Sequence, residues 1–277
     1  NNQVYDNTKT IFTQTQILDT LTNKLVELNE NANQVSAVNR YNTKLRATYD
    51  IKIDSMNSLK LTANANFYHT ESNELKNAVT TGNAGDLKNT SSRNTESVND
   101  KTAISANIIF KHKFRKARRT LSLTADWKSL ATEGNSYLKS VNQSYINGLP
   151  VTGQNLNQLK DNNKQTQNLS SKLVYTEPLG KKYSLELGYE FTYISGNNNQ
   201  VTYSYSPVSG KYDAQVDSLT NDFDQLITIH KPSVKLNYSN KKIKVNIGSG
   251  FGLTHFDMLD NTINKDYIRN FTNFFPS

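Results

Sequence analysis

One stretch of strict two-residue alternation, residues 167–193, constrains the fold more than any other part of the chain. In its second half, apolar or aromatic side chains occupy every other position, namely Tyr183, Leu185, Leu187, Tyr189, Phe191 and Tyr193. Polar or small residues fill the positions between them. Because successive side chains of a strand point to opposite faces, this period indicates a strand with one apolar face and one polar face. Pro178 and Gly180 favour a tight turn before it, so the stretch predicts a β-hairpin.

The same pattern recurs in three further segments of the chain. The predicted strand pairs are 37–53 with 59–67, 101–113 with 119–131, and 226–239 with 242–257. Short turns are expected at 54–57, 114–118, 178–181 and 239–241. A weaker alternation predicts a first strand at 8–18, and Pro232 predicts a bulge or local break because proline cannot donate to a ladder.

Long polar segments separate these hairpins. They are rich in Asn, Ser and Thr, and we expect them to form loops at 19–35, 72–99, 133–164 and 197–224. The predicted strands have about 12–16 residues, more than the ~5–6 usual in globular sheets and enough for the ~9–11 of a tilted transmembrane strand. Short turns alternating with long loops favour an all-β fold: an antiparallel up-and-down transmembrane β-barrel, or an open curved part of one, with about nine or ten strands here. The short turns would face the periplasm.

Composition is compatible with this fold and excludes a helical membrane protein. Hydrophobic residues make up 35% of the 277 residues and the mean hydropathy is −0.69, so no segment approaches the ~18 apolar residues of a membrane-spanning helix. The chain has no cysteine and therefore no disulfide framework. It starts at Asn1 and ends at Ser277 without a signal peptide or an evident closing strand. We expect residues 1–277 to be one outer-membrane β-barrel domain, an interior piece of a longer chain.

The alternation assigns side chains to two environments. The polar positions are expected to line the lumen of a barrel, with candidates Arg40, Lys44, Arg46, Lys60, Glu186, Glu190, Lys244 and Asn246. Aromatic residues are expected at the lipid interfaces, where transmembrane barrels carry girdles. The periplasmic girdle would hold Tyr183, Tyr175, Tyr238 and Phe110, and the outer one Tyr193, Phe67, Trp127 and Phe251.

The net charge of +8 raises the possibility of nucleic-acid binding. The basic turn at 112–119 is its best candidate site, but nucleic-acid binding needs a basic face built from several elements with aromatic residues for stacking. A solvated turn, or a contact with lipid headgroups or partner proteins, explains this turn better. The chain is therefore predicted to bind outer-membrane lipid and no nucleic acid.

The sequence offers no pattern for chemistry. The acidic segment with Asp213, Asp217, Asp222 and Asp224 does not match the spacing of a calcium loop, and the four histidines are scattered over separate strands. The Gly-rich run at 248–252 lies within a strand with no helix after it, so it more plausibly makes room for a plug or a bend than binds phosphate. We predict no catalytic, cofactor-binding or metal site, and no enzyme.

Three segments carry a resemblance to a known family: YTEPLGKKYSLELGYEFTY, SGKYDAQVDSLTNDFD and the terminal FTNFFPS. Over residues 36–277 the chain resembles the outer membrane β-barrel family of Bacteroidota, which is similar to TonB-dependent receptors. The resemblance implies a Gram-negative outer membrane and a barrel of about 22 strands with a plugged lumen. It also implies two partners: a plug domain elsewhere in the chain and an energy-coupling inner-membrane protein.

Two functions remain open from the sequence. The resemblance implies the wall of an importer whose ligand it does not identify, and the alternative is a non-transporting adhesin or structural scaffold. A plug domain with an energy-coupling segment upstream would favour import.

Overall fold

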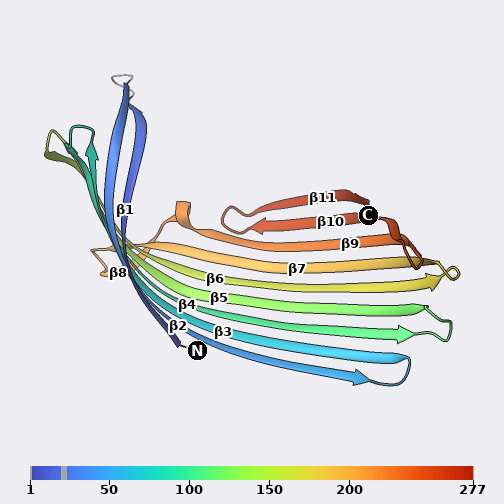
Figure 1. Ribbon diagram of the computed structural model, residues 1–277. Coiled ribbons are helices and arrows are strands. Elements are labelled where there is room, and N and C mark those ends of the chain that lie inside the picture. Colours follow the sequence, from blue (N-terminus) through green and yellow to red (C-terminus); the bar gives the residue numbers. More distant parts are fainter. Residues whose placement is uncertain (1, 20–23, 277) are drawn as a thin grey trace.

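The computed structural model describes residues 2–19 and 24–276, which form one antiparallel β-sheet (Figure 1). Its strands are β1 (Asn2–Asp19), β2 (Lys24–Lys52), β3 (Asn57–Gly82), β4 (Leu87–Lys113), β5 (Thr120–Ile146), β6 (Leu149–Pro178), β7 (Tyr183–Ser206), β8 (Lys211–Gln215), β9 (Asn221–Ser239), β10 (Lys244–Asp260) and β11 (Lys265–Pro276). Strands adjacent in sequence are adjacent in the sheet, except that the short β8 pairs only with β7. The predicted up-and-down antiparallel fold is confirmed, with eleven strands instead of nine or ten.

Helical structure is almost absent. Within the described residues the one helical element is the 3-10 turn η1 (Asp217–Leu219). No helix in this part of the chain is long and apolar enough to cross a membrane.

The four predicted short turns are confirmed, and side chains cap two of them. The Asp54 carboxylate accepts hydrogen bonds from the backbone N–H groups of Met56, at 2.6 Å, and Asn57, at 2.7 Å. The Asn240 side-chain oxygen accepts the equivalent bonds from Lys242 and Ile243 at 2.8 and 2.7 Å. Local Asx chemistry therefore closes these two hairpins.

The four predicted long loops are wrong. Residues 24–35 belong to β2, 72–82 and 87–99 to β3 and β4, and 133–146 and 149–164 to β5 and β6. Of the segment 197–224, only the connections around β8 and η1 lie outside strands. Residues 20–23, at the start of the first predicted loop, lie outside the described residues. The polar segments pair as strands because the ladder uses backbone groups only, whereas alternation appears only where one face is apolar.

The turn between β5 and β6 had a signal that the loop prediction overlooked. Asn147 and Gly148 have φ of 52° and 75°, and they form a two-residue connection between Ile146 and Leu149. Asn-Gly is the preferred pair for a type I′ hairpin turn because both residues tolerate positive φ. The strands before and after this pair are polar, so the hairpin signal had no alternation around it.

The short turns are staggered across the sheet. Ile51, Phe110, Tyr189 and Pro232 belong to one transverse row of paired residues. That row lies one residue from the turn end of β2, three from that of β4, six from that of β7 and seven from that of β9. A steady shift of this kind means that the strands are tilted relative to the line of turns, which is the geometry of a barrel wall.

The row through Trp127, Leu169 and Tyr193 divides the sheet into two parts. We call the strand segments between this row and the short turns the inner part, and the segments beyond it the outer part. Most of the apolar stripe lies in the inner part, although on β2 and β3 it continues beyond the row, to Leu45 and Phe67. In the outer part, the ends of the first strands rise steeply away from the rest of the sheet (Figure 1).

The sheet has no apolar core. Its accessible surface is 18565 Å², against about 12,000 Å² expected for a compact soluble protein of this mass. Among the described residues, the only buried hydrophobic side chains are Ala32 and Ala78. A sheet that leaves one apolar face exposed over its inner part requires an apolar solvent for that face.

The sheet is also open. Within the described residues, β1 and β11 are its two edges and do not pair with each other. Because lipid offers no partner for backbone N–H and C=O groups, an edge of this kind needs a partner strand inside a bilayer.

The predicted local break at Pro232 is confirmed on one side of β9. The β9–β10 pairing is interrupted at Lys231 and Pro232 and resumes in the same register at His230 and Leu253. On the other side, Tyr189 of β7 still faces Pro232.

Candidate solute-contacting face

All eight predicted lumen residues lie on one face of the sheet. Lys60, for example, occupies the same transverse row as Lys172, Glu190 and Lys231. Most of the least exposed side chains lie on this face too, namely Ala32, Ala78, Ser184 and Thr202. Crowding on one face is expected for the inside of a curved sheet, so we call this the inner face. That it lines a lumen stays a prediction.

The eight predicted interfacial aromatic residues all lie on the opposite, outer face. Trp127 and Tyr193 belong to one row, and Tyr183 pairs with Tyr238 with ring centroids 5.0 Å apart. Leu187, between the two tyrosines of β7, keeps 47% of its surface exposed. The outer face thus has apolar residues between aromatic borders, as a lipid-facing band does.

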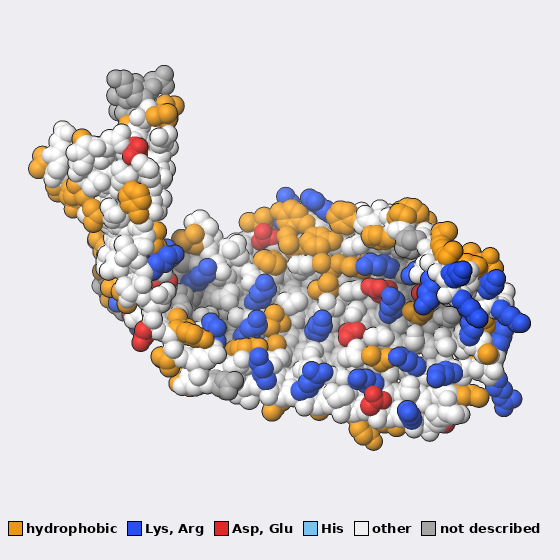
Figure 2. Space-filling model, in the orientation of Figure 1, with side chains coloured by type: hydrophobic (Ala, Val, Ile, Leu, Met, Phe, Trp, Pro, Cys, Tyr) orange, Lys and Arg blue, Asp and Glu red, His pale blue; other side chains and the backbone are white. Residues whose placement is uncertain are grey.

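The inner face is predominantly basic (Figure 2). Between the row of Lys44 and the short turns, its basic residues are Lys44, Arg46, Lys52, Lys60, Lys111, Lys113, Lys128, Lys172, Lys231, Lys235, Lys244 and Arg269. The acidic residues of the same area are Asp50, Asp126, Glu186 and Glu190. Six of these charged residues were among the predicted lumen residues, namely Lys44, Arg46, Lys60, Lys244, Glu186 and Glu190, and the alternation within each strand places the others on the same face.

A hollow of about 230 Å³ interrupts the inner face over β6, β7, β9 and β10. Its floor is one row of small residues, Gly188, Ser233 and Gly250. Longer charged side chains surround the floor, and Val174 and Phe275 continue the same row at its two ends. The hollow therefore combines a floor of small residues, charged walls and apolar groups at its two ends.

Close approach explains the glycines of this floor. A Cβ on Gly188 would lie 2.5 Å from the Ser233 hydroxyl oxygen. A Cβ on Gly250 would lie 3.0 Å from the Pro232 carbonyl oxygen and 3.2 Å from the Cβ of Ser233. The Gly-rich run was predicted to make room for a plug or a bend, and that role stays a prediction; in the structure Gly250 lies on the floor of the hollow.

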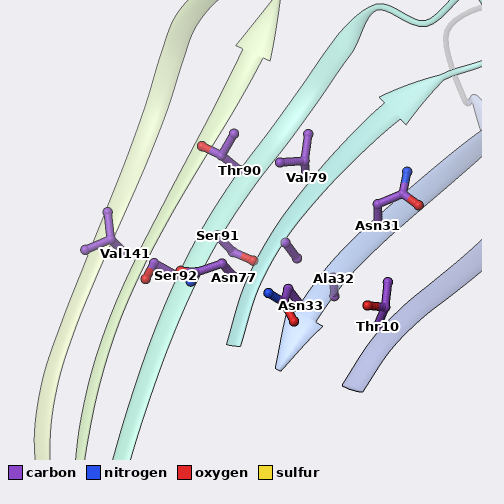
Figure 3. A pocket seen from close by; sticks show the side chains of 11 residues that line it. Thr10, Asn31, Ala32, Asn33, Asn77, Val79, Thr90, Ser91, Ser92 and Val141 are labelled. Carbon is purple, nitrogen blue, oxygen red and sulfur yellow. The ribbon is translucent and has the colours of Figure 1, made fainter. Parts of the chain in front are cut away.

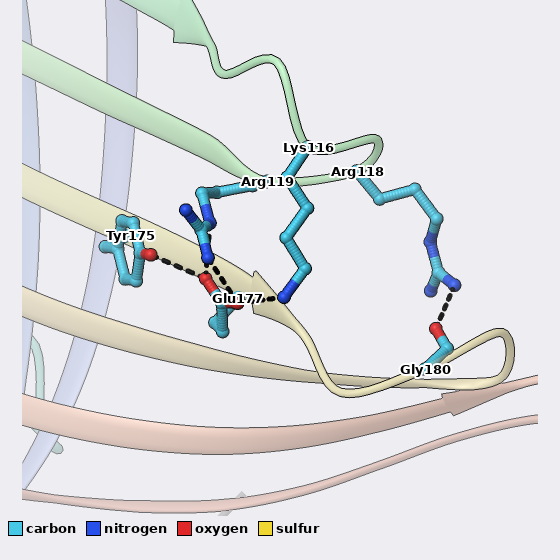
Figure 4. Close-up of polar contacts among 6 residues, drawn as sticks. All are labelled: Lys116, Arg118, Arg119, Tyr175, Glu177 and Gly180. Atoms are coloured by element: carbon cyan, nitrogen blue, oxygen red, sulfur yellow. Dashed lines mark hydrogen bonds and ion pairs between the residues drawn. The ribbon is translucent and has the colours of Figure 1, made fainter.

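The basic turn between β4 and β5 is bound to the next hairpin (Figure 4). The Arg119 guanidinium donates to both oxygens of Glu177, at 2.7 and 2.8 Å, and Lys116 and the Tyr175 hydroxyl donate to the same carboxylate at 2.5 and 2.6 Å. Arg118 donates to the carbonyl oxygens of residues 180 and 181 at 3.0 and 2.7 Å. Three basic side chains of this turn, Lys116, Arg118 and Arg119, therefore bind the adjacent hairpin.

A second hollow, of about 540 Å³, lies in the outer part, where β1–β4 bend away from the rest of the sheet (Figure 3). Its lining is small and uncharged: Thr10, Asn31, Ala32, Asn33, Asn77, Ala78, Val79, Thr90, Ser91, Ser92 and Val141. Amide and hydroxyl groups of this kind can donate and accept hydrogen bonds but cannot act as nucleophiles without an adjacent base.

The histidines have separate partners. His69 contacts Asp100 at 2.8 Å, His112 contacts Asn57 at 2.7 Å, His230 contacts the Tyr189 hydroxyl at 2.7 Å, and His255 contacts Asn270 at 2.8 Å. In residues 2–19 and 24–276, no three His, Asp or Glu side chains converge as a metal site would require.

The acidic segment is also dispersed. Asp222 and Asp224 both accept hydrogen bonds from the Asn261 amide, at 3.3 and 2.9 Å, whereas Asp213 lies on β8 and Asp217 in η1.

Comparison with known proteins gives one informative result. The model of the outer membrane protein beta-barrel family matches residues 112–277. No curated protein matches the chain. Among solved structures, the crystal structure of the outer membrane protease OmpT from Escherichia coli is similar over 99% of this chain and 92% of that one, with 9% identity and a TM-score of 0.28. Similarity at that level carries no argument about function.

Proposed function

Because the chain belongs to the outer membrane protein β-barrel family and lies in the bacterial outer membrane, we propose that it forms part of the wall of a transporter that resembles TonB-dependent receptors. In this proposal it imports a solute by binding and gating, without covalent chemistry. The outer face meets lipid, and the inner face meets the solute and a plug domain. An energy-coupling inner-membrane protein drives the uptake.

One observation carries this proposal: the basic, solvated inner face stands directly opposite an apolar outer face. A bilayer satisfies the outer face. Charged side chains on the other face need water or polar protein groups, because an unpaired charge transferred to hydrocarbon is costly. A water-filled or plug-filled interior supplies both, and the family's barrel geometry encloses one.

Uptake by living cells tests the proposal. A strain lacking the gene should lose uptake of one limiting nutrient from a defined mixture, and a protonophore should abolish the same uptake in the parent strain. Re-expression of the gene should restore it. Unchanged uptake of every nutrient in the deletion strain would refute import.

A second function, an adhesin or scaffold, is supported by the outer part of the sheet. Its turns expose apolar residues such as Ile146 and Leu149, which keep 59% and 68% of their surface exposed, and it holds the uncharged hollow of Figure 3. Such surfaces suit contact with another protein or a glycan. In this case the deletion strain would lose surface attachment while nutrient uptake stayed unchanged.

A further inference from the structure

We propose that the hollow floored by Gly188, Ser233 and Gly250 binds the carboxylate or phosphate group of a small anionic solute. This inference deepens the proposed transport function and depends on it for the source of the ligand. The binding itself can be tested separately.

The charged walls of the hollow favour an anion. Lys172 and Lys231 stand on the row above the floor with Glu190 between them, and Lys235 stands on the row below beside Glu186. The Lys231 Nζ lies 3.8 Å from the Glu190 Oε1, near the limit for an ion pair. In the described part of the chain, Lys172 and Lys235 have no carboxylate within 4.0 Å. Two lysines are therefore free to pair with an incoming anion.

The wider face reinforces this preference. Between the row of Lys44 and the short turns, basic residues outnumber acidic ones three to one on the inner face, so a positive potential extends beyond the hollow. Such a field raises the local concentration of anions, and the apolar band behind the sheet weakens its screening. Charge-assisted hydrogen bonds from lysine ammonium groups to carboxylate or phosphate then supply specific binding.

The floor and the rim indicate the rest of the ligand. The floor row carries no side chain larger than that of Ser233, so a small group can enter the hollow between the longer lysine side chains. Phe275 borders the hollow, with its ring centroid 5.9 Å from the Lys231 ammonium. A ring or apolar group beside the anionic group would pack there. The volume of about 230 Å³ suits one small molecule, or one end of a longer one, and excludes a folded segment.

Binding of phenylphosphonate to the intact protein in lipid nanodiscs tests the proposal, with benzyl alcohol as the uncharged probe. Titration calorimetry should detect phenylphosphonate and not benzyl alcohol. The double variant Lys172→Gln, Lys235→Gln, which removes the two lysines without a carboxylate partner, should weaken binding at least tenfold. The matched variant Lys52→Gln, Lys128→Gln removes the same charge from the same face outside the hollow, and it should change affinity less than twofold.

Several results would overturn the proposal. Equal losses in the two double variants would mean that the face attracts anions only diffusely. Absence of phenylphosphonate binding would also refute the proposal, and it is the result expected if an acidic protein segment covers the hollow. Native-like electrophoretic mobility of each variant without heating excludes misfolding as the cause. If the hollow binds phenylphosphonate while the deletion strain keeps all nutrient uptake, the site stands and transport fails.

Discussion

The inner and outer parts of the sheet have the same backbone pairing but different side-chain patterns. In β7, residues 183–193 alternate apolar and polar side chains, whereas residues 195–206 are mainly Asn, Gln, Ser and Tyr. Both segments pair continuously with β6, from Pro178 opposite Ser184 to Gln158 opposite Ser204. The comparison teaches that backbone pairing makes the strand, and that the alternation reports only where the strand meets lipid.

The same comparison explains the strand lengths. The strands from β2 to β7 contain 24–30 residues, and a tilted transmembrane strand needs ~9–11. The inner part satisfies that requirement in β6 and β7, with residues 169–178 and 183–193, whereas in β2–β5 it has six to eight residues and the span continues past the dividing row. The rest of each strand is a polar extension of the sheet, which holds the hollow of Figure 3.

Matched deletions in β5 and β6 should produce the largest difference between the two parts. Removing residues 122–127 and 169–174, which pair with each other, takes away the apolar stripe of β5 and β6 and leaves too short a stretch with an apolar face to span the bilayer. Removing 138–143 and 153–158, six equivalent pairs in the outer part, leaves the stripe intact. The first variant should fail to insert into lipid vesicles, and the second should insert like the parent protein, as measured by protease protection.

The opposite result would contradict this assignment. If the outer deletion abolishes insertion and the inner one does not, the membrane-spanning part lies at the other end of the strands.

An arginine scan of exposed apolar positions should give the next largest difference. Leu187→Arg places a charge in the middle of the lipid-facing band and should cost about 2–4 kcal/mol of folding free energy in bilayers. Val141 is equally exposed, with 54% of its surface accessible, but lies in the outer part. Val141→Arg should change stability by less than about 0.5 kcal/mol. Urea unfolding in lipid vesicles measures both.

Glu186→Arg is the control for the face of the sheet. Glu186 adjoins Leu187 but points to the inner face, so its substitution should cost much less than Leu187→Arg. A greater cost at Glu186 would mean that the apolar stripe is an interior core and the polar face is the exposed one.

Strand glycines should show a smaller difference of the same kind. Gly250→Val forces a side chain against the Pro232 carbonyl and Ser233, and overpacking of this type costs about 1–3 kcal/mol. At Gly153 the nearest obstacle is the flexible end of Gln143, 2.8 Å away, which can move aside. Gly153→Val should therefore be nearly neutral in the same unfolding experiment. Equal costs at the two sites would contradict the close packing around the hollow.

His69, just beyond the apolar stripe of β3, should show the smallest effect. Hydrogen bonds to Asp100 and then to Glu71 hold the pKa of the His69 imidazole above its ordinary value. A raised pKa in the folded state means that these bonds stabilise the fold fully below the pKa of the unfolded chain. That stabilisation is lost as the pH rises through the folded-state pKa.

Nuclear magnetic resonance titration of His69 checks this shift. Asp100→Asn should lower the pKa of His69, whereas Asp266→Asn, on a distant strand, should leave it unchanged. A pKa that does not respond to Asp100→Asn would exclude the hydrogen bond as its cause.

The sequence predicted the inner part well because lipid imposes a pattern on it. Apolar residues at every second position of β7, and the turn residues Pro178 and Gly180, are consequences of the bilayer and of hairpin geometry. The outer part left no such mark. Strands such as residues 133–146 are polar on both faces, so composition alone resembles a loop, and only Asn147-Gly148 signalled a hairpin.

The candidate site was predictable in part. Parity alone placed Glu186, Glu190 and Lys60 on one face, but the hollow depends on the register between β7, β9 and β10. Gly188 and Gly250 are 62 residues apart in the sequence, and both lie beside Ser233 only because β7 and β10 each pair with β9. No local sequence pattern encodes that register.

The most direct test of the account uses the absence of native cysteine. Single cysteines along β7, each carrying a spin label, would be measured in lipid vesicles for collision with oxygen, which prefers lipid, and with a water-soluble nickel complex. From 183 to 193, odd positions should favour oxygen and even positions the nickel complex. From 196 to 206, both sets should favour the nickel complex. Alternation of the opposite phase, or alternation that continues through residue 206, would contradict the account.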